Sequence, residues 1–492
     1  MGKPTGFMEV TRLENPYRDE AVRLRDFEEL HIAQPVAARR AQASRCMNCG
    51  VPFCQSDFGC PLHNLIPEWN DLLYRGRERE ALERLLQTAP FPEFTGRVCP
   101  ALCEKACNLE NAGNFANGKV IPGEAGDGDG SNHRFEARHL ATTNRDNELY
   151  LIETGFEKGW IQPRIPKYRT GRRVAVVGSG PSGLGAADLL NRLGHAVTVI
   201  ERADRPGGLL MYGIPNMKLP KGVVERRIRL MEAEGVRFLL DTEASPDITA
   251  EYDAALLCGG AKKPRALNVE NDGAPGVHFA VDYLTAATRA VLSGGTPSID
   301  AKDKAVIVVG GGDTGNDCVG TALRQGCKTI VQLEMMPAPP ETRMANNPWP
   351  EWPRTLRTDY GQLEAIYRQG GDPRIYKTTV KRIIAGPGGS IEAVETVRLD
   401  GFKPVAGTEA TLPCDLLLIA AGFVGCETAT AERFEVALNP RGCMMPPDGS
   451  HRLGDRLFSA GDMRTGQSLV VRALADGRAA ALELHETLKD QL

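Results

Sequence analysis

The sequence predicts an α/β protein with a helical, cysteine-rich N-terminal domain and two Rossmann-like dinucleotide-binding domains, the second inserted in the first. Seven of the 13 cysteines lie between residues 46 and 107. Two patterns of strand, glycine turn, helix and strand then start near residues 172 and 304, and a late apolar strand, "DLLLIAAG", precedes a closing helix. The expected domains are residues 1–170, residues 171–290 with 416–492, and residues 291–415.

The 492-residue chain has an ordinary globular composition, with 42% hydrophobic and 25% charged residues. Its formal net charge of -4 gives no reason to expect a nucleic-acid or membrane partner. No run approaches the ~18 apolar residues of a membrane span, and the first thirty residues carry charge throughout and lack an apolar signal core. We therefore expect a cytoplasmic protein, in which thiols stay reduced.

The stretch "RRVAVVGSGPSGLGAADLLNRLGHAVTVIE" predicts the first dinucleotide-binding unit. Gly178 permits a tight turn, Gly180 lets the backbone approach a pyrophosphate, and Gly183 lets helix and strand pack closely. The helix N-terminus offers free amide donors to the phosphates. Glu201 ends the second strand, where an acid can bond a ribose hydroxyl.

The stretch "KAVIVVGGGDTGNDCVGTALRQGCKTIVQLE" predicts a second unit of the same kind. Gly310, Gly312 and Gly315 form the glycine turn, and Glu334 ends the following strand. Two such units in one chain usually hold two different dinucleotides. A flavin and a nicotinamide are the natural pair, because hydride passes between them without a protein nucleophile.

The cysteine-rich region contains two groups of closely spaced thiols. They are Cys46, Cys49, Cys54 and Cys60, and then Cys99, Cys103 and Cys107. Such groups bind zinc or an iron–sulfur cluster. Clusters are favoured because prolines follow Cys60 and Cys99, as in ferredoxin-type runs. In addition, Cys318 has no C-x-x-C partner through which a flavin could reduce disulfides, so electrons need a one-electron exit that zinc cannot provide. Residues 111–132, rich in Gly, Asn and Asp, predict a surface loop.

The early glycine unit, the following "RPGGLLMYGIPNMKLP" and the late "AGDMRTGQSLVVRAL" together resemble the flavoproteins with two dinucleotide-binding domains. The resemblance implies FAD contacts at Gly178, Gly180, Gly183, Glu201, Gly208, Leu209, Lys218, Gly461, Asp462 and Val470. It implies nicotinamide-coenzyme contacts at Gly310, Gly312, Asp313, Thr314 and Gly315, and Glu334 joins this predicted site as the acid at the strand end.

The motifs "CGVPFC", "GCPLHNLIPEWN", "GRVCPALCEKAC" and "GGLLMYGIPNMKL" resemble the small (β) subunit of glutamate synthase over nearly the whole chain. A similar module opens dihydropyrimidine dehydrogenase, where the ligands of two [4Fe–4S] clusters interleave. The resemblance implies one cluster held by Cys46, Cys49, Cys54 and Cys107. It implies a second held by Cys60, Cys99, Cys103 and Glu148.

The same resemblance implies an oxidoreductase that oxidises NAD(P)H at FAD and passes electrons through the clusters to a large (α) subunit carrying FMN. That subunit converts L-glutamine and 2-oxoglutarate to two L-glutamate. No side chain of this chain is expected to act as a catalytic acid or base, since the cofactors supply the chemistry. Two alternatives stay open: the same module serving another acceptor, such as ferredoxin or a pyrimidine-reducing subunit, and a zinc-stabilised nucleotide-binding subunit without turnover.

Two further features concern the coenzyme and a partner. Glu334 at the strand end repels a 2′-phosphate and favours NADH over NADPH, although Arg343 can offset it. Trp349 and Trp352 lie between prolines in "ETRMANNPWPEWPR". They indicate either a rigid loop packed on its own domain or a contact with a partner.

Overall fold

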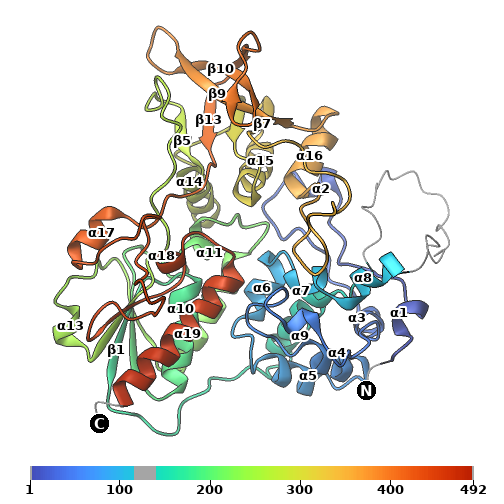
Figure 1. Ribbon diagram of the computed structural model, residues 1–492, viewed down its shortest axis with the longest axis vertical. Helices are drawn as coiled ribbons and strands as arrows, with labels where there is room; N and C mark the ends of the chain where they lie inside the picture. Colours follow the sequence, from blue (N-terminus) through green and yellow to red (C-terminus); the bar gives the residue numbers. More distant parts are fainter. Residues whose placement is uncertain (1–2, 116–139, 490–492) are drawn as a thin grey trace.

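The computed structural model describes residues 3–115 and 140–489, which form three parts (Figure 1). The cysteine domain, drawn in blue, ends with residue 157. The first unit is built on the sheet that contains the strand before the first glycine turn. The second unit, at the top of the view, is built on the sheet that contains the strand before the second glycine turn.

Short helices make up the cysteine domain. They are α1 (Gly6–Glu9), α2 (Glu20–Arg23), α3 (Val36–Ala43), η1 (Phe53–Gln55), α4 (Ile66–Tyr74), α5 (Glu78–Leu85), α6 (Pro92–Val98), α7 (Leu102–Lys105), α8 (Asn108–Phe115) and α9 (Asn144–Glu157). Ile66, Trp69 and Leu73 recur at helical spacing along α4 and are at most 2% exposed, so they anchor this domain's core. The surface loop predicted over residues 111–132 begins instead as the last turn of α8, and residues 116–139 lie outside the described part.

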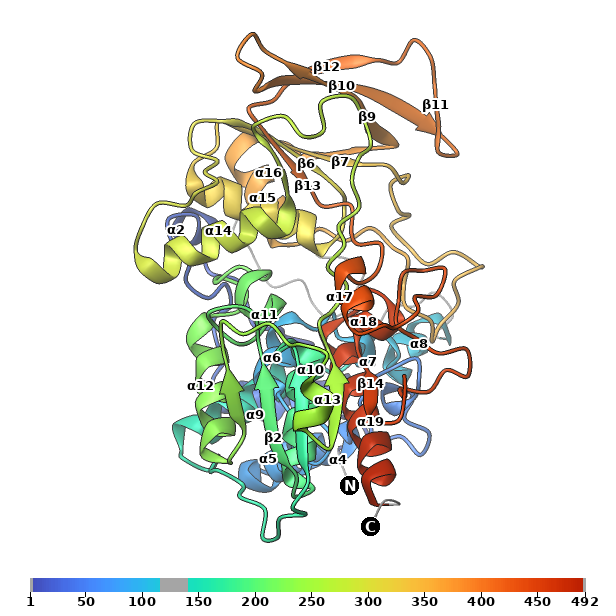
Figure 2. The ribbon, with the colours of Figure 1, turned by 90° about the vertical axis from the view of Figure 1, so that its left-hand side faces the viewer.

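The first unit contains a five-stranded parallel sheet in the order β14-β4-β1-β2-β3 (Figure 2). Its strands are β1 (Arg173–Val177), β2 (Ala196–Ile200), β3 (Arg237–Leu239), β4 (Ala254–Leu257) and β14 (Leu457–Ser459). Its helices are α10 (Pro181–Arg192), α11 (Leu209–Tyr212), α12 (Lys221–Ala233), α13 (Ile248–Glu251), α17 (Thr428–Arg433), α18 (Asp462–Thr465) and α19 (Val470–Lys489). The central strands are nearly continuous apolar runs because helices cover the sheet.

The second unit contains a parallel sheet in the order β5-β13-β6-β7-β8. Its elements are β5 (Val277–Phe279), α14 (Ala280–Ser293), β6 (Ala305–Val309), α15 (Asp313–Gln325), β7 (Thr329–Glu334), α16 (Tyr360–Gln369), β8 (Arg374–Tyr376) and β13 (Leu416–Ile419). An antiparallel sheet at its outer end contains β9 (Thr378–Ala385), β10 (Ile391–Asp400), β11 (Lys403–Pro404) and β12 (Ala410–Pro413).

The second unit is wider than the sequence predicts. Both β5 and β13 pair in its sheet, so its strands run from residue 277 to residue 419 rather than from 291 to 415. The apolar strand "DLLLIAAG" was assigned to the first unit, yet β13 lies between β5 and β6. A buried apolar run identifies a strand but not the sheet that it joins. All strands of this unit lie between β4 and β14 in the chain.

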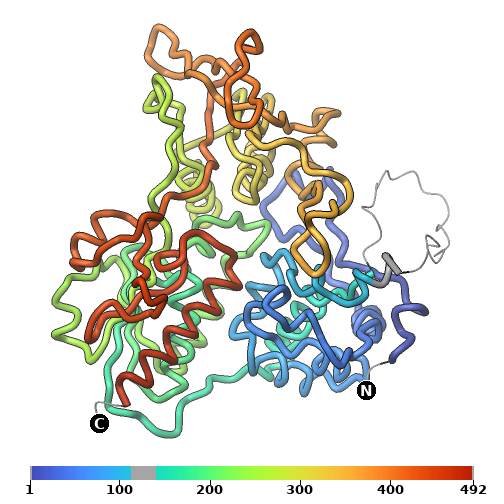
Figure 3. The backbone as a smooth tube through the Cα atoms, viewed as in Figure 1, coloured from blue at the N-terminus to red at the C-terminus, as the bar shows by residue number. Residues whose placement is uncertain are grey.

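The cysteine domain and the first unit share one hydrophobic core. Phe91 and Phe94 beside and within α6 are fully buried in the same cluster as the strands β1 and β4. Arg227 of α12 forms an ion pair with Glu93 of α6 at 2.5 Å, with both side chains at most 1% exposed. Residues 158–172 cross from one part to the other along the lower edge (Figure 3). The helices in the described ranges include none with the length and apolar character that crossing a bilayer requires.

Candidate redox-cofactor sites

The first glycine turn is packed on its inner side and open on its outer side. Gly178 has φ +101°, and a Cβ atom there would lie 2.6 Å from the carbonyl oxygen of Cys258. At Gly183 a Cβ atom would overlap the carbonyl oxygen of Gly178. At Gly180 it would meet nothing within 4 Å, so the backbone there is accessible to a pyrophosphate. The three glycines thus have the three different environments that a dinucleotide turn requires.

Glu201, at the end of β2, lies against this turn. Its Oε2 accepts hydrogen bonds from the Ser179 backbone N–H at 3.0 Å and from Ser179 Oγ at 2.6 Å. Ser179 Oγ in turn accepts from the backbone N–H of Gly207 at 2.9 Å. Sequence reasoning did not single out Ser179. Its place between Gly178 and Gly180 could have indicated this role, because a hydroxyl can donate one hydrogen bond and accept another.

The Gly207–Gly208 loop and the late Gly-Asp turn both meet the first glycine turn. A Cβ atom at Gly208 would lie 2.9 Å from Gly180 Cα. A Cβ atom at Gly461 would lie 2.6 Å from Ser182 Cβ, at the start of α10. Leu209 begins α11, next to this loop. The structure thus brings together segments separated by more than 250 residues in the chain.

The late turn is held by a polar network that sequence reasoning missed. The backbone N–H of Gly461 donates to Asp476 Oδ2 at 2.6 Å, and Arg464 Nη1 donates to Asp476 Oδ1 at 2.9 Å. Asp462 Oδ1 accepts from Ser468 Oγ at 2.9 Å, and burial raises the pKa of Asp462 to about 6. Val470 begins α19, the next helix in the chain after α18. Asp476 lies one and a half turns into that helix, so only the folded chain brings it to the glycine.

Lys218 lies at the boundary between the two units. Its Nζ donates to Asp317 Oδ1 of α15 at 3.1 Å. Burial lowers the pKa of Lys218, but the carboxylates of Asp317, Asp359 and Asp313 outweigh burial and raise it overall. The amine of Lys218 is therefore charged. Lys218 belongs to a loop of the first unit, and its amine points toward the second unit.

The second glycine turn repeats the geometry of the first. Gly310 has φ +127°, and a Cβ atom there would overlap the carbonyl oxygen of Ala420. A Cβ atom at Gly315 would overlap the carbonyl oxygen of Gly310, whereas one at Gly312 would meet nothing within 4 Å. Asp313 and Thr314 form the first turn of α15. The open position again lies at a helix N-terminus, where phosphate is favoured.

Glu334, at the end of β7, folds back toward this turn. Its Oε1 accepts from the backbone N–H of Met336 at 2.8 Å, and its Oε2 lies where a Cβ atom of Gly311 would be. Arg343 donates through Nη1 to the carbonyl oxygen of Glu351 at 2.7 Å, within its own loop. The Glu334 carboxylate thus lies beside the second glycine turn, and the Arg343 guanidinium is hydrogen-bonded within its own loop.

The first hollow in the cysteine domain is lined by the first predicted ligand set. Its walls include Cys46, Cys49, Cys54 and Cys107, with Phe53, Ile66 and Thr142. Cys46 and Cys49 come from the segment between α3 and η1, Cys54 from η1 itself, and Cys107 from the junction of α7 and α8. The fold therefore joins a late cysteine to an early group, as the interleaved assignment requires.

The second hollow is lined by the second predicted set. Its walls include Cys60, Cys99, Cys103 and Glu148, with Thr95, Arg145 and Val471. Thr95 Oγ1 donates to Glu148 Oε1, which directs this carboxyl group into the hollow. Glu148 is on α9, beyond the residues that the structure leaves undescribed, and the fold still places it beside the thiols.

Burial governs the electrostatics of both hollows. It raises the pKa of Cys46 and Cys99 to about 12 and of Cys60 and Cys107 to about 11. It also raises the pKa of Glu148 to about 8. The backbone N–H of Ala101 donates to Cys99 Sγ at 3.4 Å. Thiolate and carboxylate ligands this deeply buried need a cationic group inside the hollow, together with N–H donors such as that of Ala101. An iron–sulfur cluster provides the cationic group.

A single metal ion fits this arrangement poorly. Within residues 3–115 and 140–489, no three His, Cys, Asp or Glu side chains converge closely enough to bind one ion. The thiols instead surround hollows, as the corners of a polynuclear cluster require. The residues present therefore fit an iron–sulfur cluster in each hollow better than zinc.

Comparisons with protein families identify the same parts. The family described as dihydropyrimidine dehydrogenase domain II, 4Fe-4S cluster, matches residues 23–120. An NAD(P)-binding Rossmann-like domain matches residues 176–233, and the pyridine nucleotide-disulphide oxidoreductase family matches residues 218–349. The chain is thus a pyridine-nucleotide-dependent oxidoreductase with an iron–sulfur domain. The predicted fold class, FAD, iron–sulfur and NAD(P)H are supported, whereas the number of clusters and the preference for NADH stay predictions.

Full-length relatives define the family more closely. The chain is 46% identical to a glutamate synthase [NADPH] small chain of Bacillus subtilis, with 99% of each chain covered. It is 42% identical to one of Mycobacterium tuberculosis, covering 98% of this chain and 95% of that one. It also matches a glutamate synthase [NADH] of Schizosaccharomyces pombe at 42% identity, covering 98% of this chain but 23% of the yeast protein. The chain belongs to the family of glutamate synthase small chains, which confirms the resemblance.

Among solved structures, the fold resembles Mycobacterium tuberculosis FprA in complex with NADPH. The TM-score is 0.50 at 18% identity, with 65% of this chain and 85% of that chain covered. At this identity the likeness shows the fold alone.

Proposed function

We propose that this chain is the electron-input subunit of a glutamate synthase. It oxidises NAD(P)H at FAD and passes electrons through two [4Fe–4S] clusters to a large subunit that carries FMN. When bound, FAD accepts a hydride and the clusters carry single electrons. The large subunit then converts L-glutamine and 2-oxoglutarate to two L-glutamate. The names of the small-chain relatives support a separate large partner, and the much longer yeast relative supports a fused one.

One observation carries the electron route. Val471, in the first turn of α19, lines the second hollow, and α19 begins next to the late turn of the proposed flavin site. Ile66 lines both hollows, so a single side chain lies between them. This arrangement supports a path from the first unit to the second hollow and then to the first hollow. Electrons would leave for the large subunit from there.

The chain's own residues bind and orient the cofactors. Gly180 and the N-terminus of α10 bind the FAD pyrophosphate, with Glu201 and the turn at Gly461 and Asp462 on either side of it. Gly312 and the N-terminus of α15 bind the coenzyme phosphates. The two thiol sets, with Glu148 as the eighth ligand, bind the clusters. No side chain is assigned a proton-transfer step.

NADH is the proposed coenzyme. Glu334 lies where the adenosine ribose of a coenzyme would bind, and a carboxylate there accepts from a 2′-hydroxyl but repels a 2′-phosphate. Arg343, the cation that would offset this repulsion, donates to a carbonyl oxygen of its own loop. Among the relatives, the Bacillus subtilis small chain carries NADPH in its name and the Schizosaccharomyces pombe protein carries NADH.

The test is anaerobic reduction of the purified, cluster-reconstituted chain by NADH and by NADPH, with and without a candidate large subunit. Bleaching of the flavin by NADH, with glutamine-dependent glutamate formation only when the candidate is present, is the expected result. Bleaching without glutamate formation would support the electron-transfer role but overturn the large subunit as the acceptor, and another acceptor such as ferredoxin would then be assigned. Absence of bleaching with both coenzymes would overturn the proposal.

A further inference from the structure

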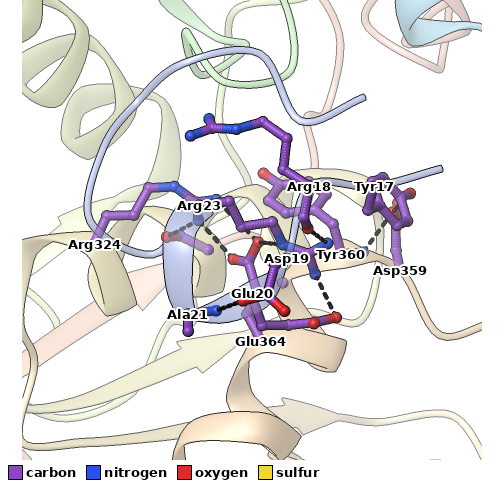
Figure 4. Close-up of polar contacts among 12 residues, drawn as sticks. Tyr17, Arg18, Asp19, Glu20, Ala21, Arg23, Arg324, Asp359, Tyr360 and Glu364 are labelled. Atoms are coloured by element: carbon purple, nitrogen blue, oxygen red, sulfur yellow. Dashed lines mark hydrogen bonds and ion pairs between the residues drawn. The ribbon is translucent and has the colours of Figure 1, made fainter. Parts of the chain in front are cut away.

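All three parts of the chain meet at one buried junction, and Figure 4 shows the contacts there between the N-terminal segment and the second unit. An N-terminal arm, residues 16–31, leaves the cysteine domain and lies against α15 and α16 of the second unit. We call this place the arm junction. Its members are Tyr17, Arg23 and Leu30 of the arm, Met217 and Lys218 of the first unit, and Asp317, Arg324, Tyr360 and Glu364 of the second.

The centre of the arm junction is apolar. Leu30, Met217 and Tyr360 are at most 2% exposed and form one cluster, one residue from each part of the chain. The backbone N–H of Leu30 donates to the carbonyl oxygen of Met217 at 3.0 Å. Asn216 Nδ2 donates to the carbonyl oxygen of Phe27 at 2.8 Å. The arm is therefore tied to the first unit by its backbone.

Charged groups tie the same arm to the second unit. Arg23 Nε donates to Glu364 Oε1 at 2.7 Å, and both side chains are fully buried. Arg324 donates to the two oxygens of Glu364 at 2.6 and 2.9 Å, and its Nε donates to the carbonyl oxygen of Asp26 at 3.0 Å. A buried carboxylate with two guanidinium partners has little freedom, because losing either contact leaves a charge uncompensated.

A second set of contacts connects the two nucleotide-binding units directly. Lys218 Nζ and Tyr360 Oη both donate to Asp317 Oδ1, at 3.1 and 2.8 Å. Asp317 is one helical turn beyond Asp313, at the coenzyme end of α15. Any rotation of α15 relative to the first unit must break these contacts and those of Arg23 together.

We propose that the N-terminal arm positions the second unit for hydride delivery to the flavin, and that Arg23 and Glu364 are positioning residues for this step. The inference rests on the proposed function. Neither residue touches the glycine turns, so both act through α15 and α16. The iron–sulfur part of the chain thereby takes part in the reduction of the flavin and not only in its reoxidation.

The test is stopped-flow reduction of the flavin by NADH in the reconstituted full-length chain. Arg23→Gln is expected to slow flavin reduction by about tenfold or more, because a small misalignment of donor and acceptor is costly. The apparent Kd for NADH should change little, since the coenzyme contacts are intact. Arg23→Lys should recover part of the rate. The matched control is Arg25→Gln, which makes the same charge change at an exposed residue of the arm. This variant is expected to reduce its flavin at the wild-type rate.

FAD and iron content and the thermal midpoint are measured first. If Arg23→Gln does not fold, Glu364→Gln replaces it, because an amide keeps the shape and one acceptor. A folded, fully loaded variant that reduces its flavin at the wild-type rate overturns the inference. Failure of the wild-type chain to be reduced by either coenzyme overturns the proposed function instead, so the two failures are distinct. Equal slowing of flavin reduction by NADH and by dithionite also overturns the inference, since dithionite needs no second unit.

Discussion

The indole N–H of Trp349 donates to the carbonyl oxygen of Cys107 at 3.2 Å. Trp349 belongs to the loop between β7 and α16 of the second unit, and Cys107 lines the first hollow of the cysteine domain. The ring centroids of Trp349 and Phe53 are 4.7 Å apart, and Phe53 is another residue that lines this hollow. The loop that the sequence assigned either to its own domain or to a partner therefore packs on the cysteine domain.

We expect Trp349→Phe to lower stability by about 1 kcal/mol, the net value of one hydrogen bond, because the ring stays in place. Trp349→Ala should cost about 1–3 kcal/mol, since the contact with Phe53 is also lost. Urea unfolding followed by fluorescence measures both. Iron retained after gel filtration shows whether the first cluster becomes labile. Trp352→Phe is the control, because Trp352 contacts Arg357 of its own loop. Equal effects at both tryptophans would contradict the assignment.

We expect Glu148→Ala to remove one cluster and leave the other. Iron content should fall from about eight to about four atoms per chain, because each cubane cluster holds four irons. Metal analysis and low-temperature electron paramagnetic resonance of the reduced protein measure this loss. Glu157→Ala, at an exposed position of the same helix, is the control. Full iron content in a folded Glu148→Ala protein would show that another group completes the second set.

Two alanine substitutions in the first glycine turn should fail in different ways. Gly183→Ala should prevent folding, because its methyl group overlaps the carbonyl oxygen of Gly178. Gly180→Ala should fold, since its methyl group meets open space, but bind FAD poorly because the pyrophosphate needs that space. Absorbance at the flavin bands per chain and circular dichroism separate the two effects. Gly222→Ala, also open, should keep its FAD.

We expect Glu334→Gln to shift the coenzyme preference toward NADPH. Removing the carboxylate charge removes its repulsion of a 2′-phosphate, and the KM for NADPH should fall by about tenfold, the effect of about 1.4 kcal/mol. The KM for NADH should rise because an acceptor of the ribose hydroxyl is weakened. Steady-state assays with an artificial electron acceptor measure both constants. Glu341→Gln, an exposed change nearby, is the control. An unchanged ratio of the two constants would place the ribose elsewhere.

Stability should fall as the pH is lowered from about 6.5 toward 4, in part because of His195. Burial and the neighbouring His485 lower the pKa of His195 to about 4, and the two rings share a 2.8 Å hydrogen bond. In the unfolded chain the His195 imidazole binds its proton near pH 6.5, whereas in the folded chain it does so only near pH 4. The free energy of unfolding therefore falls by about 1–3 kcal/mol as the pH is lowered through this window. Thermal midpoints between pH 7.5 and 4 should show this loss. The slope should be smaller in His195→Gln, and an identical slope would assign the effect to other groups.

By itself, the sequence determined the two nucleotide-binding units and the two groups of thiols. Glycine spacing and strand-end acids act locally, through turns of a few residues, so pattern alone identified Gly178, Gly310 and their neighbours. Resemblance to a family added Glu148 to the list of ligands. The structure then places it in the hollow with Cys60, Cys99 and Cys103.

Only the tertiary structure decided which sheet β13 joins, where Lys218 points and how the parts are held together. An apolar run such as residues 416–419 satisfies either sheet, because burial is not directional. The contacts Arg23–Glu364 and Trp349–Cys107 join residues 341 and 242 positions apart. No local pattern encodes such pairs, since they depend on how three folded parts pack and on the need of each buried charge or donor for a partner.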